Sequence, residues 1–283
     1  MSLHESDAAT ARFHALIDRP DDEIDLAEGA LLIAKKAYPN LDIGDYLSRI
    51  DRLAHAVSER LPAAASETDR ILALNRYLFE ELGFGPNVED YYDQRNSFLN
   101  DVLERRVGIP ISLSVLYIEV GRRVGLPLQG VSFPGHFLVK CKLEQGVVIL
   151  DPYGSGTSLS LHDLQQRLRA TRGGEVSRAI VAAMLVAADK KQILARMLRN
   201  LKGIYVEQGD HNRALSVMDW IVCVVPGDAA EVRDRGLLFL QLEGFRAALR
   251  DLERYLALAP SADDAQQIRG HVAALRQTVA RLN

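Results

Sequence analysis

Residues 108–154 decide the fold of this chain: GIPISLSVLYIEVGRRVGLP (108–127), LQGVSFPGHFLVKCK (128–142), a polar link, and VVILDPYG (147–154). Pro110 suits the first turn of a helix, where its missing N–H costs nothing, and residues 125–127 carry the glycine and proline that end one. Phe137, Val139 and Cys141 alternate with Lys140 and Lys142, which gives the two-residue period of a half-buried strand. Residues 147–150 read as a second strand, so the stretch predicts a helix followed by a β-hairpin.

Two registers are open for this hairpin. A four-residue loop, 142–145, places His136 directly opposite Asp151. A two-residue turn at 145–146 instead places Asp151 opposite Lys140. Both registers keep the same side-chain parity, so His136 and Asp151 share one face and the apolar set that begins with Phe137 takes the other. Because a carboxylate can hold an imidazole in one tautomer, His136 and Asp151 are candidate catalytic residues.

The composition describes an ordinary globular protein with room for two domains: 283 residues, 48% hydrophobic and 25% charged. A net charge of −4 without a basic face argues against a nucleic-acid partner. The sequence has no apolar run of 18 residues, so no membrane partner is expected. The first residues carry no apolar signal segment, which predicts a cytoplasmic protein.

The cysteines and histidines do not suggest a metal or a cofactor. The chain has two cysteines, Cys141 and Cys223, in apolar contexts far apart in sequence, and seven histidines without paired spacing. We therefore expect no metal site and no cofactor.

Residues 1–88 read as a layer of helices that packs on the core. Asp42 is suited to cap one helix, and Ser66 with Asp69 resembles a capping box ahead of another. Residues 83–97 then have loop chemistry, rich in Gly, Pro, Asn, Asp and Tyr.

A repeat of 34 residues marks the C-terminal part. Shifting the sequence by this period places Ala214 on Ala248 and Pro226 on Pro260. Helix, small residue, helix and proline at this spacing is the tetratricopeptide pattern, in which each helix pair buries its face by stacking on a neighbour. The predicted domains are therefore a helical layer at 1–88, a core at 89–172 and repeat helices at 178–283.

The central motif YYDQRNSFLNDVLERRVGIPISLSVLYIEVGRRVGLPLQGVSFPGHFLV, followed by such repeats, resembles the bacterial SirB family, and its core resembles the transglutaminase-like superfamily. This resemblance implies an α+β fold: a papain-like core with a small antiparallel sheet, then an all-α repeat region. It also implies a triad for acyl transfer, made of a cysteine at a helix N-terminus, a histidine and an aspartate. His136 and Asp151 match the last two.

The chain departs from that triad at the nucleophile. The position where the resemblance places the cysteine holds Pro110. Cys141 cannot replace it, because its odd offset from His136 sends it to the apolar face of the strand, and Cys223 lies in the repeats. Without a thiolate, the usual acyl-enzyme chemistry has no nucleophile.

Three interpretations follow. In the first, the domain is a pseudoenzyme that binds a protein or peptide partner through a cleft and the repeats, with any regulatory role left open. In the second, Ser112 acts as the nucleophile of a Ser/His/Asp hydrolase or acyl transferase with His136 and Asp151. In the third, another chemistry uses Glu104, Asn100 or Glu119. The candidate binding residues are Tyr92, Asn96, Asn100, Glu104 and Tyr153.

Overall fold

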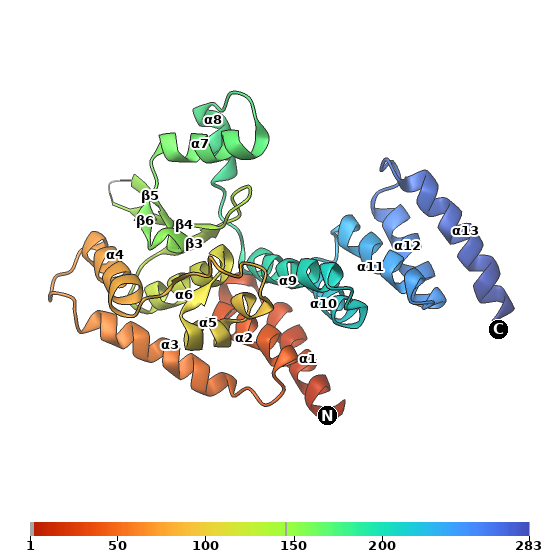
Figure 1. The fold of residues 1–283 in the computed structure, drawn as a ribbon, viewed down its shortest axis with the longest axis horizontal. Helices are drawn as coiled ribbons and strands as arrows, with labels where there is room; N and C mark the ends of the chain where they lie inside the picture. Colours follow the sequence, from red (N-terminus) through yellow and green to blue (C-terminus); the bar gives the residue numbers. More distant parts are fainter. Residues whose placement is uncertain (1–2, 145, 283) are drawn as a thin grey trace. The chain divides into compact units, whose positions relative to one another are not determined.

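The computed structural model describes residues 3–144 and 146–282, and it divides the chain into two compact units, Met1–Met197 and Leu198–Asn283 (Figure 1). The first unit contains α1 (Leu3–Ile17), η1 (Asp21–Glu23), α2 (Leu26–Ala37), α3 (Ile43–Ser58), α4 (Glu67–Asn75), η2 (Arg76–Glu81), β1 (Gly85–Pro86), η3 (Gln94–Ser97), α5 (Leu99–Arg105), β2 (Val107–Gly108), α6 (Pro110–Arg123), β3 (Leu128–Val131), β4 (Leu138–Leu143), β5 (Gly146–Asp151), η4 (Pro152–Gly154), β6 (Thr157–Ser158), α7 (Leu161–Arg172) and α8 (Arg178–Met184). Helix α9 (Lys190–Glu207) continues into the second unit, which also contains α10 (His211–Val224), α11 (Ala229–Gln241), α12 (Phe245–Leu258) and α13 (Ala265–Arg281). The predicted α+β class is confirmed.

Helix α6 forms the centre of the first unit. Every residue from Pro110 to Gly121 is buried, and α6 contacts α2, α3, α4, β3 and β4. Pro110 occupies its first position, as predicted. Gly121 lets β3 approach, because a Cβ at this position would lie 2.3 Å from Leu128 Cδ1.

The helices around α6 begin where the sequence predicts. The Asp42 carboxylate accepts hydrogen bonds from the backbone N–H groups of Gly44 and Asp45 at the start of α3. Ser66 and Asp69 form the predicted capping box of α4.

The main sheet is antiparallel, with four strands in the order β3-β4-β5-β6. One face carries Val131, Leu138 and Ile149, which pack in a buried cluster with Leu168 of α7 and Val181 of α8 (Figure 1). The boundary between the two compact units lies after residue 197. Residues 172–178, which separate two of the predicted domains, lie between α7 and α8, and both helices contribute to the same apolar cluster. The assignment of 1–88, 89–172 and 178–283 as domains stays a prediction.

Several contacts join the beginning of the first unit to its end. The Asp21 carboxylate accepts a hydrogen bond of 2.7 Å from the backbone N–H of Lys190, the first residue of α9. The Lys190 ammonium donates to the carbonyl of Asp22 at 2.9 Å. A Cβ at Gly29 of α2 would lie 2.8 Å from Leu194 Cδ1, so α2 and α9 are in close contact.

The second unit has the helical pairs that the 34-residue period predicts. Ala214 and Ala248 are fully buried in α10 and α12. Val232 of α11, Leu252 of α12 and Val272 of α13 belong to one apolar cluster. Each helix thus buries its apolar face on its neighbours.

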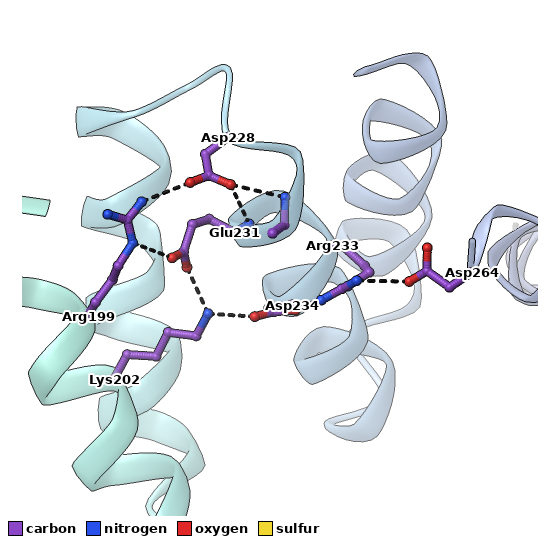
Figure 2. Close-up of polar contacts among 8 residues, drawn as sticks. Arg199, Lys202, Asp228, Glu231, Arg233, Asp234 and Asp264 are labelled. Carbon is purple, nitrogen blue, oxygen red and sulfur yellow. Dashed lines mark hydrogen bonds and ion pairs between the residues drawn. The ribbon is translucent and has the colours of Figure 1, made fainter. Parts of the chain in front are cut away.

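A network of charges joins α9 to α11 in this unit (Figure 2). Glu231 is only 6% exposed, and its carboxylate receives Arg199 Nε and Lys202 Nζ, each at 2.7 Å. Arg199 also donates to Asp228, and Lys202 to Asp234, so each cation bridges two carboxylates. Burial alone would lower the pKa of Lys202, but these hydrogen bonds raise it above its ordinary value.

Candidate functional site

The hairpin of β4 and β5 carries His136 and Asp151 at its open end. Its ladder pairs Cys141 with Val148, a register that lies between the two predicted ones, so both predicted registers are wrong. The parity common to both is kept. Gln145, which both predicted turns include, lies outside the described residues.

The face of the hairpin that packs on α6 is apolar, as predicted, but the other face is not polar and half-buried as expected, because Leu138 and Ile149 bury it under α7 and α8. Val139 and Cys141 are fully buried, and β4 contacts α6. Burial raises the pKa of the Cys141 thiol to about 11, so this cysteine is not a thiolate at neutral pH. Leu138 and Ile149 face α7 and α8, and Asp151 belongs to this second face by parity.

His136 and Asp151 are brought together, and a third residue joins them. His136 Nε2 lies 2.8 Å from Asp151 Oδ1, and Arg167 Nη2 of α7 donates to Asp151 Oδ2 at 2.8 Å. Asp151 is 3% exposed. Burial alone would raise its pKa, but the hydrogen bonds from His136 and Arg167 hold that pKa below its ordinary value.

The ionised Asp151 fixes the neutral tautomer of His136. Because the carboxylate only accepts, the neutral imidazole carries its proton on Nε2 and offers Nδ1 as an acceptor. Among the described residues no hydrogen bond reaches Nδ1. His136 thus presents one acceptor to a ligand, while both oxygens of Asp151 are engaged by the protein.

One tyrosine, Tyr153, packs against this imidazole. The ring of Tyr153 meets His136 edge-on at 5.7 Å. Burial raises the pKa of Tyr91, and the electrostatic effects of Tyr153 and Tyr92 raise it further. Tyr91 and Tyr92 are themselves in edge-to-face contact at 5.3 Å.

Ser112 is not part of this group. It is fully buried, its hydroxyl donates to the carbonyl of Asn96 at 2.6 Å, and its Oγ accepts from the backbone N–H of Ile109. In the described part of the chain no hydrogen bond joins Ser112 to His136. Its bonds are those of a helix cap at the start of α6.

Replacing Ser112 by alanine is expected to lower the free energy of unfolding by about 1–3 kcal/mol, because the Ile109 N–H and the Asn96 carbonyl lose a buried partner. Urea unfolding measures the change. The exposed Ser48→Ala, which also loses a bond to a helix carbonyl, should change stability by no more than about 0.5 kcal/mol. A stable Ser112→Ala variant that had lost a measurable hydrolysis would instead make Ser112 a nucleophile.

Comparison with known proteins agrees with this geometry. Residues 44–199 match the family model described as transglutaminase-like superfamily, and residues 201–273 match the tetratricopeptide repeat model. The chain belongs to the transglutaminase-like superfamily. A UPF0162 protein of Xylella fastidiosa is 44% identical over 258 residues, which cover 89% of this chain and 90% of that protein.

More distant relatives extend the similarity. A UPF0162 protein of Vibrio cholerae is 31% identical over 261 residues, covering 92% of this chain and 96% of that one. The human F-box only protein 21 is 29% identical over 225 residues, which cover 69% of this chain and 35% of that protein. No solved structure matches.

The other candidate residues of this transglutaminase-like domain separate into two kinds. Asn96 is fully buried and organises the preceding loop, with Nδ2 donating to the carbonyls of Asp90 and Tyr91. Glu119 is buried in α6, where Arg123 pairs with it at 2.6 Å. Neither side chain is open to a ligand.

Asn100 and Glu104 lie on α5 and line a different pocket, together with Tyr38, Tyr46 and Asp101. Tyr153 instead packs against His136, and Tyr92 packs against Tyr91. Tyr91, Asp101 and Arg167 are the residues that sequence reasoning missed. Tyr91 is adjacent to Tyr92 and Asp101 is adjacent to Asn100, so nearness to a candidate residue could have indicated both. Nothing in the sequence indicated Arg167.

No cluster of His, Cys, Asp or Glu within 3–144 and 146–282 has an arrangement that could hold a metal ion. Over the same ranges, no helix combines the length and apolar character that crossing a membrane requires.

Proposed function

We propose that the transglutaminase-like domain is a non-catalytic binding domain that, with its tetratricopeptide repeats, binds a protein or peptide partner. The observation that carries this proposal is the engagement of Asp151 by both His136 and Arg167 beside a helix that begins at Pro110. The acid and the base of a triad are retained, while the nucleophile position has neither a thiol nor a hydroxyl. His136, Asp151 and Arg167 therefore act as a rigid support for a binding surface.

The tyrosines supply that surface. Tyr92 is 67% exposed, Tyr91 is 44% exposed, and Val88 of the same loop is 78% exposed. Aromatic rings with a polar tip offer large contact area at little cost in side-chain entropy, which suits protein recognition. His136 Nδ1 adds an acceptor for a backbone N–H of an extended peptide. Tetratricopeptide arrays commonly bind chains too, which supports a second binding surface.

Selecting a displayed peptide library against the full chain tests this proposal. We expect Tyr92→Ala to weaken the selected peptides by about tenfold, the loss of one aromatic anchor. Leu72→Ala is the matched control, because Leu72 is a comparably exposed apolar side chain on α4, and it should leave binding unchanged. Equal loss in both variants, or no loss in either, would contradict a binding surface at Tyr92.

A catalytic function predicts a different result. Activated-ester, fluorophosphonate and amide substrates should report a turnover that His136→Ala abolishes. Detecting that turnover in the wild type would overturn the non-catalytic proposal, whatever the peptides do.

A further inference from the structure

A pocket of about 430 Å³ lies between α5 and the segment that joins α2 to α3. Asn100, Asp101 and Glu104 line it from α5, and Tyr38 and Tyr46 line it from the other side. Pro39 and Leu41 add apolar wall. The pocket thus combines two carboxylates with aromatic and aliphatic surface.

The Asn100 side chain in this pocket lacks a partner. Asn100 is 4% exposed, and its Oδ1 is buried without a hydrogen bond. Its Nδ2 likewise makes no hydrogen bond to the described residues, so a rotation that exchanges the two atoms breaks no bond within the protein. A buried amide without partners costs free energy, and a ligand that donates to Oδ1 would recover it.

Asp101 has no cation bonded to it. It is 8% exposed, and its Oδ2 accepts a hydrogen bond of 2.7 Å from the neutral Tyr38 hydroxyl. Burial raises the pKa of Asp101, while Tyr38 and Arg105 oppose the rise and Glu104 adds to it. The described residues form no ion pair with this carboxylate, so its charge is only partly compensated.

The charged side chains around this pocket include one more carboxylate than cations. Arg49 pairs with Asp45 at 2.9 Å and lies 3.8 Å from Glu104. Arg95 and Arg105 both pair with Asp93. This linked set holds four carboxylates and three guanidinium groups: Asp45, Asp93, Asp101 and Glu104 with Arg49, Arg95 and Arg105. The set thus has one more carboxylate than guanidinium groups, an excess that a cationic ligand would balance.

The chemistry of the walls favours a planar cation. Arg49 already lies over the Tyr46 ring, with Cζ 4.6 Å from its centroid, so this surface accommodates a guanidinium. A guanidinium is weakly hydrated and presents several N–H donors in a fixed fork, which matches acceptors on one helical turn better than a strongly hydrated ammonium does. We propose that this pocket binds the guanidinium group of a ligand between Asp101, Glu104 and the Asn100 amide.

Blocked amino acids test the proposal on the full chain by calorimetry and by the shift of the melting temperature. Nα-acetyl-arginine amide should bind and raise the melting temperature, while the neutral isostere Nα-acetyl-citrulline amide should not. Nα-acetyl-lysine amide, which has the same charge, should bind at least about tenfold more weakly. Equal binding of the lysine or citrulline compound would overturn the guanidinium assignment.

Two isosteric variants locate the site. Asp101→Asn and Asn100→Leu should each weaken the arginine compound by about tenfold or more. Both remove an uncompensated buried group, so without ligand their melting temperatures should equal or exceed that of the wild type. Asp51→Asn, which removes an exposed carboxylate paired with Arg123, is the control for net charge and should bind normally. Undiminished binding in Asp101→Asn would overturn the proposal.

Free arginine separates the two sources of such a group. Tighter binding of the blocked compound supports a peptide side chain, and tighter binding of free arginine supports a small metabolite. Neither result depends on Tyr92 or His136, so this test is independent of the peptide-binding test.

Discussion

Replacing Asp151 by alanine is expected to lower the free energy of unfolding of the first unit by about 3 kcal/mol, because two hydrogen bonds to a buried charged carboxylate are lost, while the partly exposed Arg167 regains water. His136 and Arg167 each lose a bond of 2.8 Å, and β5 loses its link to α7. Urea unfolding followed by circular dichroism measures the loss. Amide hydrogen exchange in β4 and β5 should accelerate at the same time.

The same carboxylate predicts a dependence on acid. The pKa of folded Asp151 is lowered, so its contribution is complete above the unfolded value of about 4 and is lost as pH falls below that value toward the folded pKa. The wild type should therefore lose stability more steeply below about pH 4 than Asp151→Ala does. Asp51→Ala is the control, because its carboxylate is exposed, and its stability should follow the wild-type curve within about 1 kcal/mol. Parallel acid curves for wild type and Asp151→Ala would contradict the buried bonds.

Replacing Glu231 by glutamine is expected to lower the free energy of unfolding of the second unit by about 3 kcal/mol, the lower end for a broken buried pair. Two cations, Arg199 and Lys202, would then face a neutral amide in a largely buried position. Each keeps one other carboxylate, which limits the loss. Trp220 is the single tryptophan of the chain and lies 1% exposed in α10, so its fluorescence reports on this unit.

Glu253→Gln is the matched control for this prediction. Glu253 pairs with Arg276 at 2.7 Å, but the two side chains are 41% and 66% exposed. An exposed pair of this kind contributes at most about 1 kcal/mol, and that contribution is screened by salt. Similar losses in the two variants would mean that burial does not strengthen the network of Figure 2.

Local sequence signals predicted the elements of the fold well. Capping residues such as Asp42 and Ser66 act on the adjacent turn, and Pro110 fixes its own backbone angle, so neither depends on distant contacts. The 34-residue period predicted the repeat helices because the helices of every repeat pack in the same way. The hairpin register was not predictable, since both candidate turns preserve the alternation that identifies the strands.

The sequence predicted the candidate site only where side-chain parity determines which residues share a face of the hairpin. His136 and Asp151 share a face in every register with that parity, and they do form a hydrogen bond. Arg167 reaches Asp151 from α7, whose position on the sheet depends on the packing of Leu168 and its neighbours rather than on spacing. Ser112 was assigned to the site because it lies close to Pro110 in sequence. In α6 its hydroxyl instead bonds to the backbone of the segment that precedes the helix.

The bonds between Asp21 and Lys190 set the order in which the protein can mature during synthesis. The two residues are 169 positions apart, so α2 leaves the ribosome long before α9, which contacts it, exists. Until residue 194 emerges, the face of α2 around Gly29 lacks the Leu194 side chain that covers it. The nascent first unit therefore stays incomplete until nearly all of it has been translated, and during that interval it exposes apolar surface of the kind that makes partly folded chains prone to aggregation.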